Sequence, residues 1–466
     1  MGKWVHIIGI CGSGTSGLAC MLKEKGFKVT GSDSSFYPPA NLILEKAGII
    51  GMEGYKDSNI GTPDLVIEAT ACGKDNPEVN LAKEKGLKII SFPEALGEIF
   101  LKDVSSIVIA GTHGKTTISS LLAWILENAG FDPSFLIGGV PINFGTNYKL
   151  CTTKYFVIEG DEYISSRDNP TPKFCYYQPK IALISNIELD HIDTYGNLED
   201  IKSAFRHLVD LIPKNGSLIV GADNQHVLDV AKGARCQVTT YGISEDSDWK
   251  ATHIQLSETG ACFEVINRDK PTGRFSTKLA GMHNVKNALG AIAVAKTLSI
   301  SNMDIQKAFD SFKGTKKRLE VIEVVNEVTI IDDYAHHPTE VKETLSALKT
   351  RYPNNRIFCV FEPRTHSSRR RRFMAEYASS FLEATEVIIT PVYKPQDLDK
   401  EDMLDPEELV KMMKNAQYIP SMDGIIDYLL KGLSKGDVVV FMSPGDFSRT
   451  YNKLIKGFCT IENGDL

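Results

Sequence analysis

Residues 105–130 read SSIVIAGTHGKTTISSLLAWILENAG, in which an apolar strand pattern, a turn bounded by two glycines and a helix pattern follow one another directly. In turns of this kind the backbone amides close on phosphate oxygens, a lysine supplies a positive charge, and a hydroxyl at the helix N-terminus is placed to ligate magnesium. A full Walker pattern also has glycine at the position of Ile109, so this chain carries the shorter form G-x-x-G-K-T. The stretch predicts a triphosphate site, with Thr116 as a magnesium ligand, formed by Gly111, Thr112, His113, Gly114, Lys115, Thr116 and Thr117.

Strand and helix patterns alternate on both sides of this stretch, which indicates an α/β chain with mainly parallel sheets. The length of 466 residues exceeds what a single hydrophobic core usually supports. We expect a Rossmann-like domain at residues 1–102, a central P-loop ATPase domain at 103–315, and a second Rossmann-like domain at 316–466. Strand-like runs with short turns between residues 253 and 281 predict an antiparallel annex on the central sheet.

The composition is that of a globular protein, with 42% hydrophobic and 24% charged residues and no apolar run long enough to cross a membrane. Nine cysteines without a C-x-x-C pair favour reduced thiols and a cytoplasmic location. A net charge of -7 and a pI near 5.9 argue against nucleic acid as a partner. We therefore expect a cytoplasmic monomer or weak dimer that binds neither nucleic acid nor membrane.

A second glycine-rich turn, GICGSGTSG at residues 9–17, follows the first strand pattern and opens a helix. Its spacing fits the diphosphate of a dinucleotide or of a sugar nucleotide, and it also fits a tight structural turn. An NAD-dependent oxidoreductase is the alternative that this turn suggests, but it leaves the triphosphate loop unexplained. The residues expected to bind such a nucleotide here are Gly12, Ser13, Gly14, Thr15, Ser16 and Asp33.

Acidic residues follow two apolar strand patterns of the central block. Glu159, Asp161 and Glu162 end the run YFVIEGDE, and Asp190 and His191 end the run SNIELDH. Because parallel strands present their carboxyl ends at one edge, these groups are expected to converge on magnesium near Thr116. The alternatives are a solvated acidic turn and a histidine that only packs.

Further polar residues stand at helix starts and strand ends in the last two blocks. Asn284 and Asn287 share one face of a helix and can hydrogen-bond a purine. Arg318, in a hinge position, suits phosphoryl charge, and Arg364 at a strand end suits a carboxylate of the acceptor. The basic run at residues 369–372 is expected to be mostly a solvated helix face.

The segments G-T-H-G-K-T, E-G-D-E, N-I-E-L-D-H-I-D-T-Y, G-M-H-N-V-K-N-A and D-D-Y-A-H-H-P-T-E, in this order, resemble the Mur ligase family over essentially the whole chain. The resemblance implies an N-terminal UDP-sugar domain, a central ATPase domain and a C-terminal domain that brings the amino acceptor. It also implies that Lys115 and Thr116 bind ATP and magnesium, and that Glu159 and His191 bind metal. By the same resemblance, Asn284 and Asn287 bind adenine, and Asp333 binds the ribose. Arg318 is then expected at the terminal phosphates and His336 in the reacting region. Some members carry a carbamylated lysine where this chain has Arg206, so no modified lysine is expected.

The implied reaction uses ATP and Mg²⁺ to phosphorylate the lactyl carboxylate of UDP-N-acetylmuramate, after which an amine attacks the acyl phosphate. Lys115, Glu159, His191, Arg318 and His336 are the expected catalytic residues, with His191 or His336 as the general base. The segments at 362–364 and 442–445 resemble the branch that attaches the tripeptide L-alanyl-γ-D-glutamyl-meso-diaminopimelate in peptidoglycan recycling. The alternative is the biosynthetic branch that adds free L-alanine, to which NIELDHIDTY is nearer.

Overall fold

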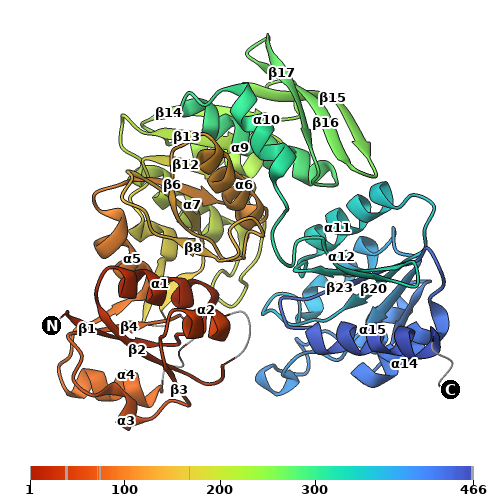
Figure 1. Ribbon diagram of the computed structural model, residues 1–466, viewed down its shortest axis with the longest axis horizontal. Helices are drawn as coiled ribbons and strands as arrows, with labels where there is room; N and C mark the ends of the chain where they lie inside the picture. The colour runs from red at the N-terminus through yellow and green to blue at the C-terminus, as the bar shows by residue number, and fades with distance from the viewer. Residues whose placement is uncertain (1, 37–39, 71, 73–74, 167, 463–466) are drawn as a thin grey trace.

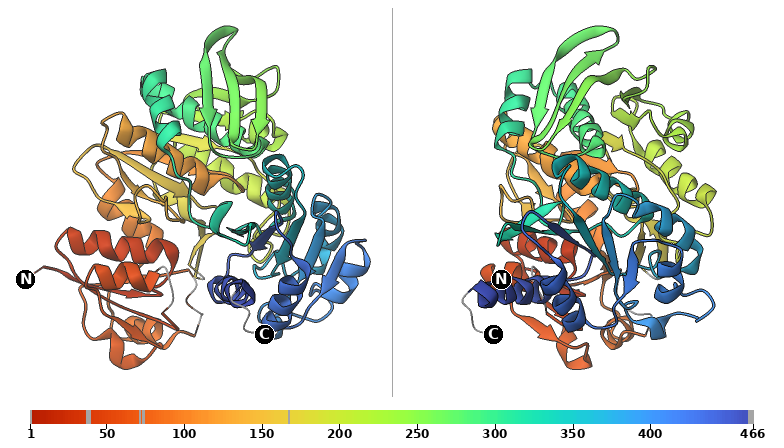
Figure 2. Two further views of the ribbon diagram at one scale, coloured as in Figure 1. Left: turned by 45° about the vertical axis from the view of Figure 1, so that its right-hand side comes forward. Right: turned by 90° about the vertical axis from the view of Figure 1, so that its right-hand side faces the viewer.

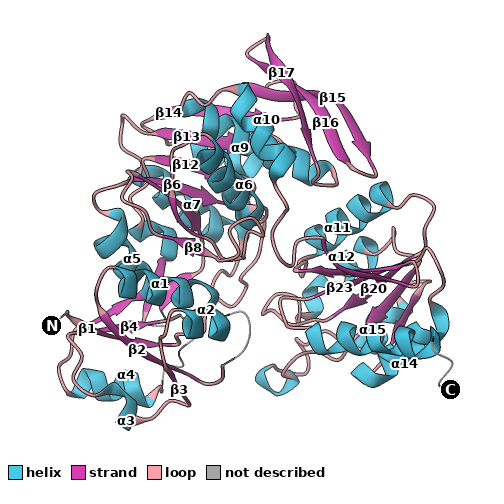
Figure 3. Ribbon diagram, viewed as in Figure 1, coloured by secondary structure: helices cyan, strands magenta, loops and turns pink. Residues whose placement is uncertain are grey.

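Three separate β-sheets organise the chain in the computed structural model, which describes residues 2–36, 40–70, 72, 75–166 and 168–462. The sheets fall within residues 4–91, 105–277 and 320–442, and each carries helices on its faces (Figure 1; Figure 3). The three-domain α/β architecture expected from the sequence is confirmed. We propose to keep the boundaries at 102/103 and 315/316, because each resulting span contains one of these sheets.

The N-terminal sheet has the strand order β3-β2-β1-β4-β5, and all its pairs are parallel. Its strands are β1 (Trp4–Ile8), β2 (Lys28–Asp33), β3 (Gly51–Glu53), β4 (Leu65–Glu68) and β5 (Ile89–Ser91). Its helices are α1 (Ser13–Glu24), α2 (Ala40–Lys46), α3 (Asp57–Ile60), α4 (Pro77–Glu84), α5 (Phe92–Leu96) and the π-helical turn η1 (Gly97–Leu101). The order reverses between β1 and β4, which is where doubly wound sheets bind their ligands.

The central sheet has ten strands in the order β17-β16-β15-β14-β13-β12-β6-β9-β7-β8. The parallel part contains β6 (Ser105–Ala110), β7 (Ser134–Leu136), β9 (Tyr155–Gly160), β12 (Ile181–Ile184), β13 (Ser217–Gly221) and β14 (Gln237–Gly242), with β8 (Tyr148–Lys149) antiparallel at one edge. The predicted annex is present as β15 (Trp249–Ser257), β16 (Gly260–Asn267) and β17 (Lys270–Thr277). Because β15 also pairs in parallel with β14, the annex continues the main sheet.

The helices of the central domain are α6 (Lys115–Asn128), the 3-10 turn η2 (Lys173–Tyr176), α7 (Leu198–Leu211), α8 (Gln225–Ala231), α9 (Met282–Thr297) and α10 (Asn302–Ser311). A separate antiparallel hairpin, β10 (Ile164–Ser166) with β11 (Asn169–Pro172), leaves the sheet after β9. It reaches the N-terminal domain, where the Thr70 hydroxyl donates to the carbonyl of Ser165 at 2.9 Å.

The C-terminal sheet has the order β18-β19-β23-β20-β21-β22, in which only the β18–β19 pair is antiparallel. Its strands are β18 (Glu320–Val325), β19 (Val328–Asp333), β20 (Ile357–Phe361), β21 (Glu386–Ile389), β22 (Ala416–Tyr418) and β23 (Val438–Met442). The helical segments are α11 (Pro338–Arg351), η3 (Arg371–Phe373), α12 (Met374–Ser380), η4 (Pro395–Asp397), α13 (Pro406–Lys411), α14 (Met422–Gly432) and α15 (Ser448–Glu462). Strands β20 and β23 are buried at every position, as apolar runs in a covered parallel sheet should be.

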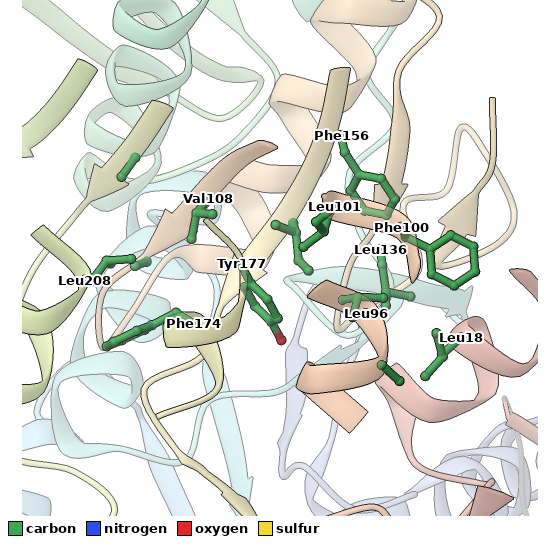
Figure 4. Close-up of a cluster of buried hydrophobic side chains, with 14 of the residues drawn as sticks. Leu18, Leu96, Phe100, Leu101, Val108, Leu136, Phe156, Phe174, Tyr177 and Leu208 are labelled. Carbon is green, nitrogen blue, oxygen red and sulfur yellow. The ribbon is translucent and has the colours of Figure 1, made fainter. Parts of the chain in front are cut away.

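The N-terminal and central domains share one apolar core. Leu18 of α1 and Leu96 of α5 belong to the same buried cluster as Leu136 of β7 and Phe156 of β9 (Figure 4). Helix α1 packs so closely on the central domain that a Cβ on Gly17 would lie 2.5 Å from Leu136. The C-terminal domain lies to one side of this pair, and its strands form buried clusters of their own (Figure 2). None of the helices in the described part of the chain has the length and apolar character that a membrane crossing requires.

A buried carboxylate ties together the N-terminal domain. Glu78 of α4 is fully buried and accepts hydrogen bonds from the Ser32 hydroxyl at 2.5 Å, the Asn59 amide at 2.7 Å and the Lys56 backbone amide at 3.0 Å, with His6 at 3.3 Å. Burial opposes ionisation, but these hydrogen bonds outweigh it and hold the pKa of Glu78 below its ordinary value.

We expect Glu78→Gln to lower the free energy of unfolding by about 3 kcal/mol at neutral pH, because an amide cannot accept all these donors. Because the pKa of Glu78 is lower in the folded than in the unfolded protein, its ionised form stabilises the fold at pH values above the unfolded pKa. This contribution is lost as the pH falls, so the difference in unfolding free energy between the wild type and Glu78→Gln should shrink below about pH 4.5. Denaturant unfolding between pH 3 and 7 measures it. Glu84→Gln, an exposed substitution on the same helix, should show no such change. A pH-independent deficit would contradict the assignment.

Candidate functional site

The phosphate loop joins β6 to α6 at the carboxyl edge of the central sheet. Gly111 has φ +129° and Gly114, which caps α6, has φ +86°. Gly111 is required by space as well as by conformation, since a Cβ there would lie 2.1 Å from Ser185 Oγ. The parallel neighbours β9, β12 and β13 end at the same edge and bring their following loops to this turn.

Lys115 begins α6 and is held in place by groups of the loop and of the neighbouring strand. Its ammonium donates to the Gly111 carbonyl at 2.6 Å and to Glu162 Oε2 at 2.8 Å. The side chain is 14% exposed and that of Glu162 is 1% exposed. Burial opposes the charge, but Glu162 and Asp161 outweigh it and raise the pKa of Lys115. The lysine therefore stays charged beside the predicted phosphate site.

The three predicted metal ligands fall into two groups. Thr116 Oγ1 lies 3.2 Å from Glu159 Oε2, and the other oxygen of Glu159 accepts from the Gly138 amide at 2.7 Å. His191, in contrast, lies 3.4 Å from Glu162 Oε1. The structure thus brings Thr116 and Glu159 together and gives His191 a different carboxylate partner.

Asp161, Glu162 and His191 form a cluster whose ligand atoms lie within 4.8 Å of one another. His191 adopts φ +51°, a conformation that costs a non-glycine residue energy and is concentrated at functional sites. Burial opposes its charge, but Asp190, Glu162 and Asp161 raise its pKa to about 9. Asp161 and Glu162 appear in the sequence as part of E-G-D-E, but the linear pattern did not show which of the three acids faces the histidine.

The possible metal ligands of the two groups are one hydroxyl, three carboxylates and one imidazole. Most of the ligand atoms are therefore oxygens, which suits Mg²⁺. Glu162 Oε1 is buried and, apart from the His191 ring at 3.4 Å, has no partner among the described residues. A divalent cation would satisfy that oxygen, so the residues present fit the predicted metal.

A cavity of about 250 Å³ extends from the phosphate loop between the central and C-terminal domains. Seven of the predicted ATP-binding residues line it, whereas four others, Gly111, Thr112, Lys115 and Thr116, do not. The seven are His113, Gly114, Thr117, Asn284, Asn287, Arg318 and Asp333. The sequence interpretation missed other lining residues, among them Asn186, Asp223, Tyr241 and Glu340, although Asn186 and Glu340 stand within the segments N-I-E-L-D-H-I-D-T-Y and D-D-Y-A-H-H-P-T-E. Asp223 follows the end of β13 and Tyr241 is the last residue but one of β14, so a place near a strand end is the sequence signal that marks them.

Hydrogen bonds within the protein fix the predicted nucleotide-binding side chains. Asn284 donates to the Ala280 carbonyl at 2.8 Å, and Asn287 donates to Asn284 Oδ1 at 3.0 Å. The carboxylate of Asp333 accepts from the backbone amides of Leu319 and Ala335 at 2.7 and 2.8 Å. Its role at a ribose therefore stays a prediction.

Arg318 and His336 lie on the C-terminal side of the cavity. The Arg318 guanidinium covers the Tyr334 ring at 4.7 Å, and one of its nitrogens lies 3.5 Å from Thr116 Oγ1. His336 Nδ1 lies 3.2 Å from Glu340 Oε2. Arg318 thus brings a positive charge from the C-terminal domain to Thr116, a predicted metal ligand.

The N-terminal glycine turn is closed by its own side chains. Thr15 Oγ1 donates to the Gly9 carbonyl at 2.7 Å, and Ser16 Oγ donates to the Ser13 carbonyl at 3.2 Å. Asp33 accepts from the Cys11 amide at 2.8 Å. Gly12 caps α1, which starts at Ser13, and Gly14 lies against the ring of Phe92. UDP-sugar binding by these residues stays a prediction, in which backbone amides rather than Thr15 and Ser16 hydroxyls face the ligand.

Arg364 follows the end of β20, and neighbouring side chains hold its guanidinium in place. Its guanidinium covers the Tyr393 ring at 3.7 Å and donates to Glu362 at 3.3 Å. Its side chain is 30% exposed, and its role in binding an acceptor carboxylate stays a prediction. Arg206, the position of the modified lysine in relatives, lies on α7 and pairs with Glu199 at 2.6 Å.

The prediction that residues 369–372 form a mostly solvated helix face holds for Arg371 and Arg372, which are exposed, and is wrong for Arg369 and Arg370. Arg369 is buried and donates to the Tyr393 carbonyl at 3.0 Å, while Arg370 and Arg371 pair with Asp402 and Glu408. The partners come from a loop and helix that follow β21, so the sequence run alone does not reveal them.

Comparison with known proteins matches three family models along the chain. Residues 4–103 match "Mur ligase family, catalytic domain", 109–295 match "Mur ligase middle domain", and 317–445 match "Mur ligase, glutamate ligase domain".

Curated relatives and solved structures are similar over almost the whole chain. The UDP-N-acetylmuramate–L-alanine ligases of Caldanaerobacter subterraneus and Acetivibrio thermocellus are 38% and 36% identical over 462 residues, covering 97% of this chain and 97% and 96% of theirs. The murein peptide ligase of Psychrobacter arcticus is 32% identical, with a TM-score of 0.77 over 98% of this chain and 99% of that one. The UDP-N-acetylmuramate-alanine ligase of Thermotoga maritima, at 22% identity, shares the fold with a TM-score of 0.82, over 98% of this chain and 100% of that one.

Proposed function

Because the chain belongs to the Mur ligase family, whose members are ATP-dependent amide ligases, we propose that it joins the carboxylate of UDP-N-acetylmuramate to the amine of free L-alanine. The observation that carries this choice is the 38% identity over 97% of the chain to a ligase that uses L-alanine. Membership in a ligase family removes the reason for the NAD-dependent oxidoreductase alternative.

The geometry of the site supports the two steps of such a ligation. First, a carboxylate oxygen of the sugar nucleotide attacks the γ-phosphorus of ATP, ADP leaves, and an acyl phosphate forms. The amine then attacks the acyl carbon, and phosphate leaves with the bond to the carboxyl carbon broken. Lys115 is placed to offset charge on the transferred group, and Arg318 approaches the same place from the other domain.

Magnesium, when bound, would offset phosphate charge, and Thr116, Glu159, Asp161, Glu162 and His191 are the residues that would hold it. His191 or His336 would take the proton that the attacking amine loses. The pKa of His191, raised to about 9 by its acidic neighbours, makes His191 a poor base in the described state. His336 is therefore the better candidate of the two.

The tripeptide acceptor that the 362–364 and 442–445 segments favour is the second candidate. It is supported by the 32% identity to the Psychrobacter arcticus murein peptide ligase over 98% of the chain. Arg364 adds a specific reason, because a partly open guanidinium suits a peptide that carries several carboxylates. The curated relatives, at up to 38% identity, support L-alanine more strongly.

An ATP-consumption assay with UDP-N-acetylmuramate separates the two acceptors. We expect ADP release with free L-alanine to exceed release with L-alanyl-γ-D-glutamyl-meso-diaminopimelate by at least about 100-fold in kcat/KM. Arg364→Ala should change the L-alanine reaction by less than about threefold, because alanine offers one carboxylate only. A preference for the tripeptide, lost in Arg364→Ala, would overturn the choice in favour of the second candidate.

A further inference from the structure

The side chain of His113 turns away from the phosphate loop to which it belongs. Its imidazole lies between two carboxylates, with Nε2 3.2 Å from Glu188 Oε2 and Nδ1 3.1 Å from Glu340 Oε1. Glu188 belongs to the central domain, whereas Glu340 lies in the first turn of α11 in the C-terminal domain. The His113 side chain is only 12% exposed, so this contact is sheltered from water.

A second set of contacts crosses the same domain boundary in the opposite direction. Thr339 Oγ1 donates to Glu188 Oε2 at 2.7 Å, and His337 Nε2 lies 3.4 Å from the Leu189 carbonyl. The rings of His113 and His337 lie 4.7 Å apart. We call the five residues His113, Glu188, His337, Thr339 and Glu340 the clasp.

The pKa shifts and hydrogen bonds of the clasp fit one set of protonation states. Burial opposes a charge on His113, but its hydrogen bonds to Glu188 and Glu340 and their charges raise its pKa to about 10. The pKa of Glu188 is held at about 2. Burial and the His113 charge lower the pKa of His337, whose Nδ1 accepts from the Thr339 amide at 3.3 Å. His113 is thus an imidazolium that donates from both nitrogens, and His337 is neutral.

The backbone of His113 is fixed to the central sheet at the same time. Its amide donates to Asn186 Oδ1 at 2.8 Å, and its carbonyl accepts from Ser185 Oγ at 2.7 Å. Lys115 follows two residues later and donates to the carbonyl of Thr112 at 3.2 Å. The residues whose carbonyls hold the lysine, Gly111 and Thr112, thus immediately precede His113 in the loop.

We infer that His113 is a positioning residue that ties the phosphate loop to the C-terminal domain, so that Lys115 is correctly placed only when that domain is docked. The inference deepens the proposed ligation and rests on it, because the C-terminal domain would bring the acceptor. The clasp makes ATP use depend on the domain that carries the amine.

A double-mutant cycle with His113→Gln, Glu340→Gln and the double variant tests the coupling. Glutamine at position 340 keeps an acceptor for the amides of His336 and His337, so the capping of α11 is preserved. Each single variant should lose between about tenfold and about 100-fold in kcat, with a smaller change in KM for UDP-N-acetylmuramate. The double variant should be no slower than the slower single variant. Glu376→Gln, an exposed substitution in the first turn of α12, is the matched control with unchanged kcat.

Small-angle scattering of the nucleotide-free protein gives a readout that needs no catalysis. His113→Gln and Glu340→Gln should increase the radius of gyration relative to Glu376→Gln. If His113→Gln fails to fold, Thr339→Val tests the same boundary without altering the loop and should also increase it. Losses in kcat that multiply in the double variant, or scattering identical to the control, would overturn the inference. Absence of ligation in the wild type together with expanded scattering of the variants would instead count against the proposed function alone.

Discussion

Lys115→Ala should reduce acceptor-dependent ADP release by about a thousandfold or more, because no other ammonium donates at the phosphate loop in the described structure. Binding of UDP-N-acetylmuramate should persist, since its predicted site lies in the N-terminal domain. A coupled ADP assay and titration calorimetry with the sugar nucleotide measure the two properties separately. Retained turnover would refute the assignment of the loop.

The same substitution should also destabilise the protein, by about 3 kcal/mol, because it leaves the buried carboxylate of Glu162 without its lysine. The double variant Lys115→Met with Glu162→Gln removes both charges and should recover most of that free energy while remaining inactive. If the double variant is as unstable as Lys115→Ala, the ion pair is not the cause of the loss. The pair of variants thus separates catalytic from structural contributions of one lysine.

Gly111→Ala should lower the free energy of unfolding by about 3 to 5 kcal/mol and reduce turnover by about 100-fold or more. The added Cβ would meet the Ser185 hydroxyl at 2.1 Å and the backbone amides of Ser185 and Asn186 at 3.0 and 3.1 Å. Those backbone atoms follow β12 directly, so they cannot move without distorting the sheet edge that holds His113. Thermal and denaturant unfolding, together with ADP release, measure the effect.

Gly130→Ala is the matched control for that prediction. Gly130 also has positive φ, +77°, and lies at the other end of α6, but a Cβ there meets nothing within 4 Å. It should cost about 1 kcal/mol from backbone conformation alone and leave turnover unchanged. Equal losses for the two alanines would show that conformation, rather than the close approach of Ser185, limits Gly111.

Local patterns were sufficient to predict the three sheets and the phosphate loop. Apolar runs such as β6 and β23 are read directly from the sequence because burial on both faces requires them. The annex was predictable for a related reason, since β15–β17 are joined by short turns. The hairpin β10–β11 escaped prediction because its strands are short and polar, and its pairing is supported by contacts with the N-terminal domain.

The sequence predicted several residues of the candidate site but not their pairings. Glu159 and His191 were both predicted as metal ligands, yet Glu159 lies beside Thr116 and the partner of His191 is Glu162. The contacts of the clasp could not be predicted from the sequence, because Glu188 and Glu340 lie 75 and 227 positions from His113. The arginines at 369–371 show the same limitation, since folding supplies partners that composition does not indicate.

The two junctions of the chain differ in what they allow to change. Side chains on both sides of the N-terminal junction share one continuous packed interior, so a replacement on one side demands a compensating replacement on the other. At the opposite junction, the clasp consists of a few hydrogen-bonded groups, of which a different C-terminal module would need to supply only three residues. Selection for a new amine can therefore change the last 150 or so residues while the rest of the enzyme stays as it is. Different acceptors can in this way be combined with the same ATP-binding and sugar-nucleotide-binding domains.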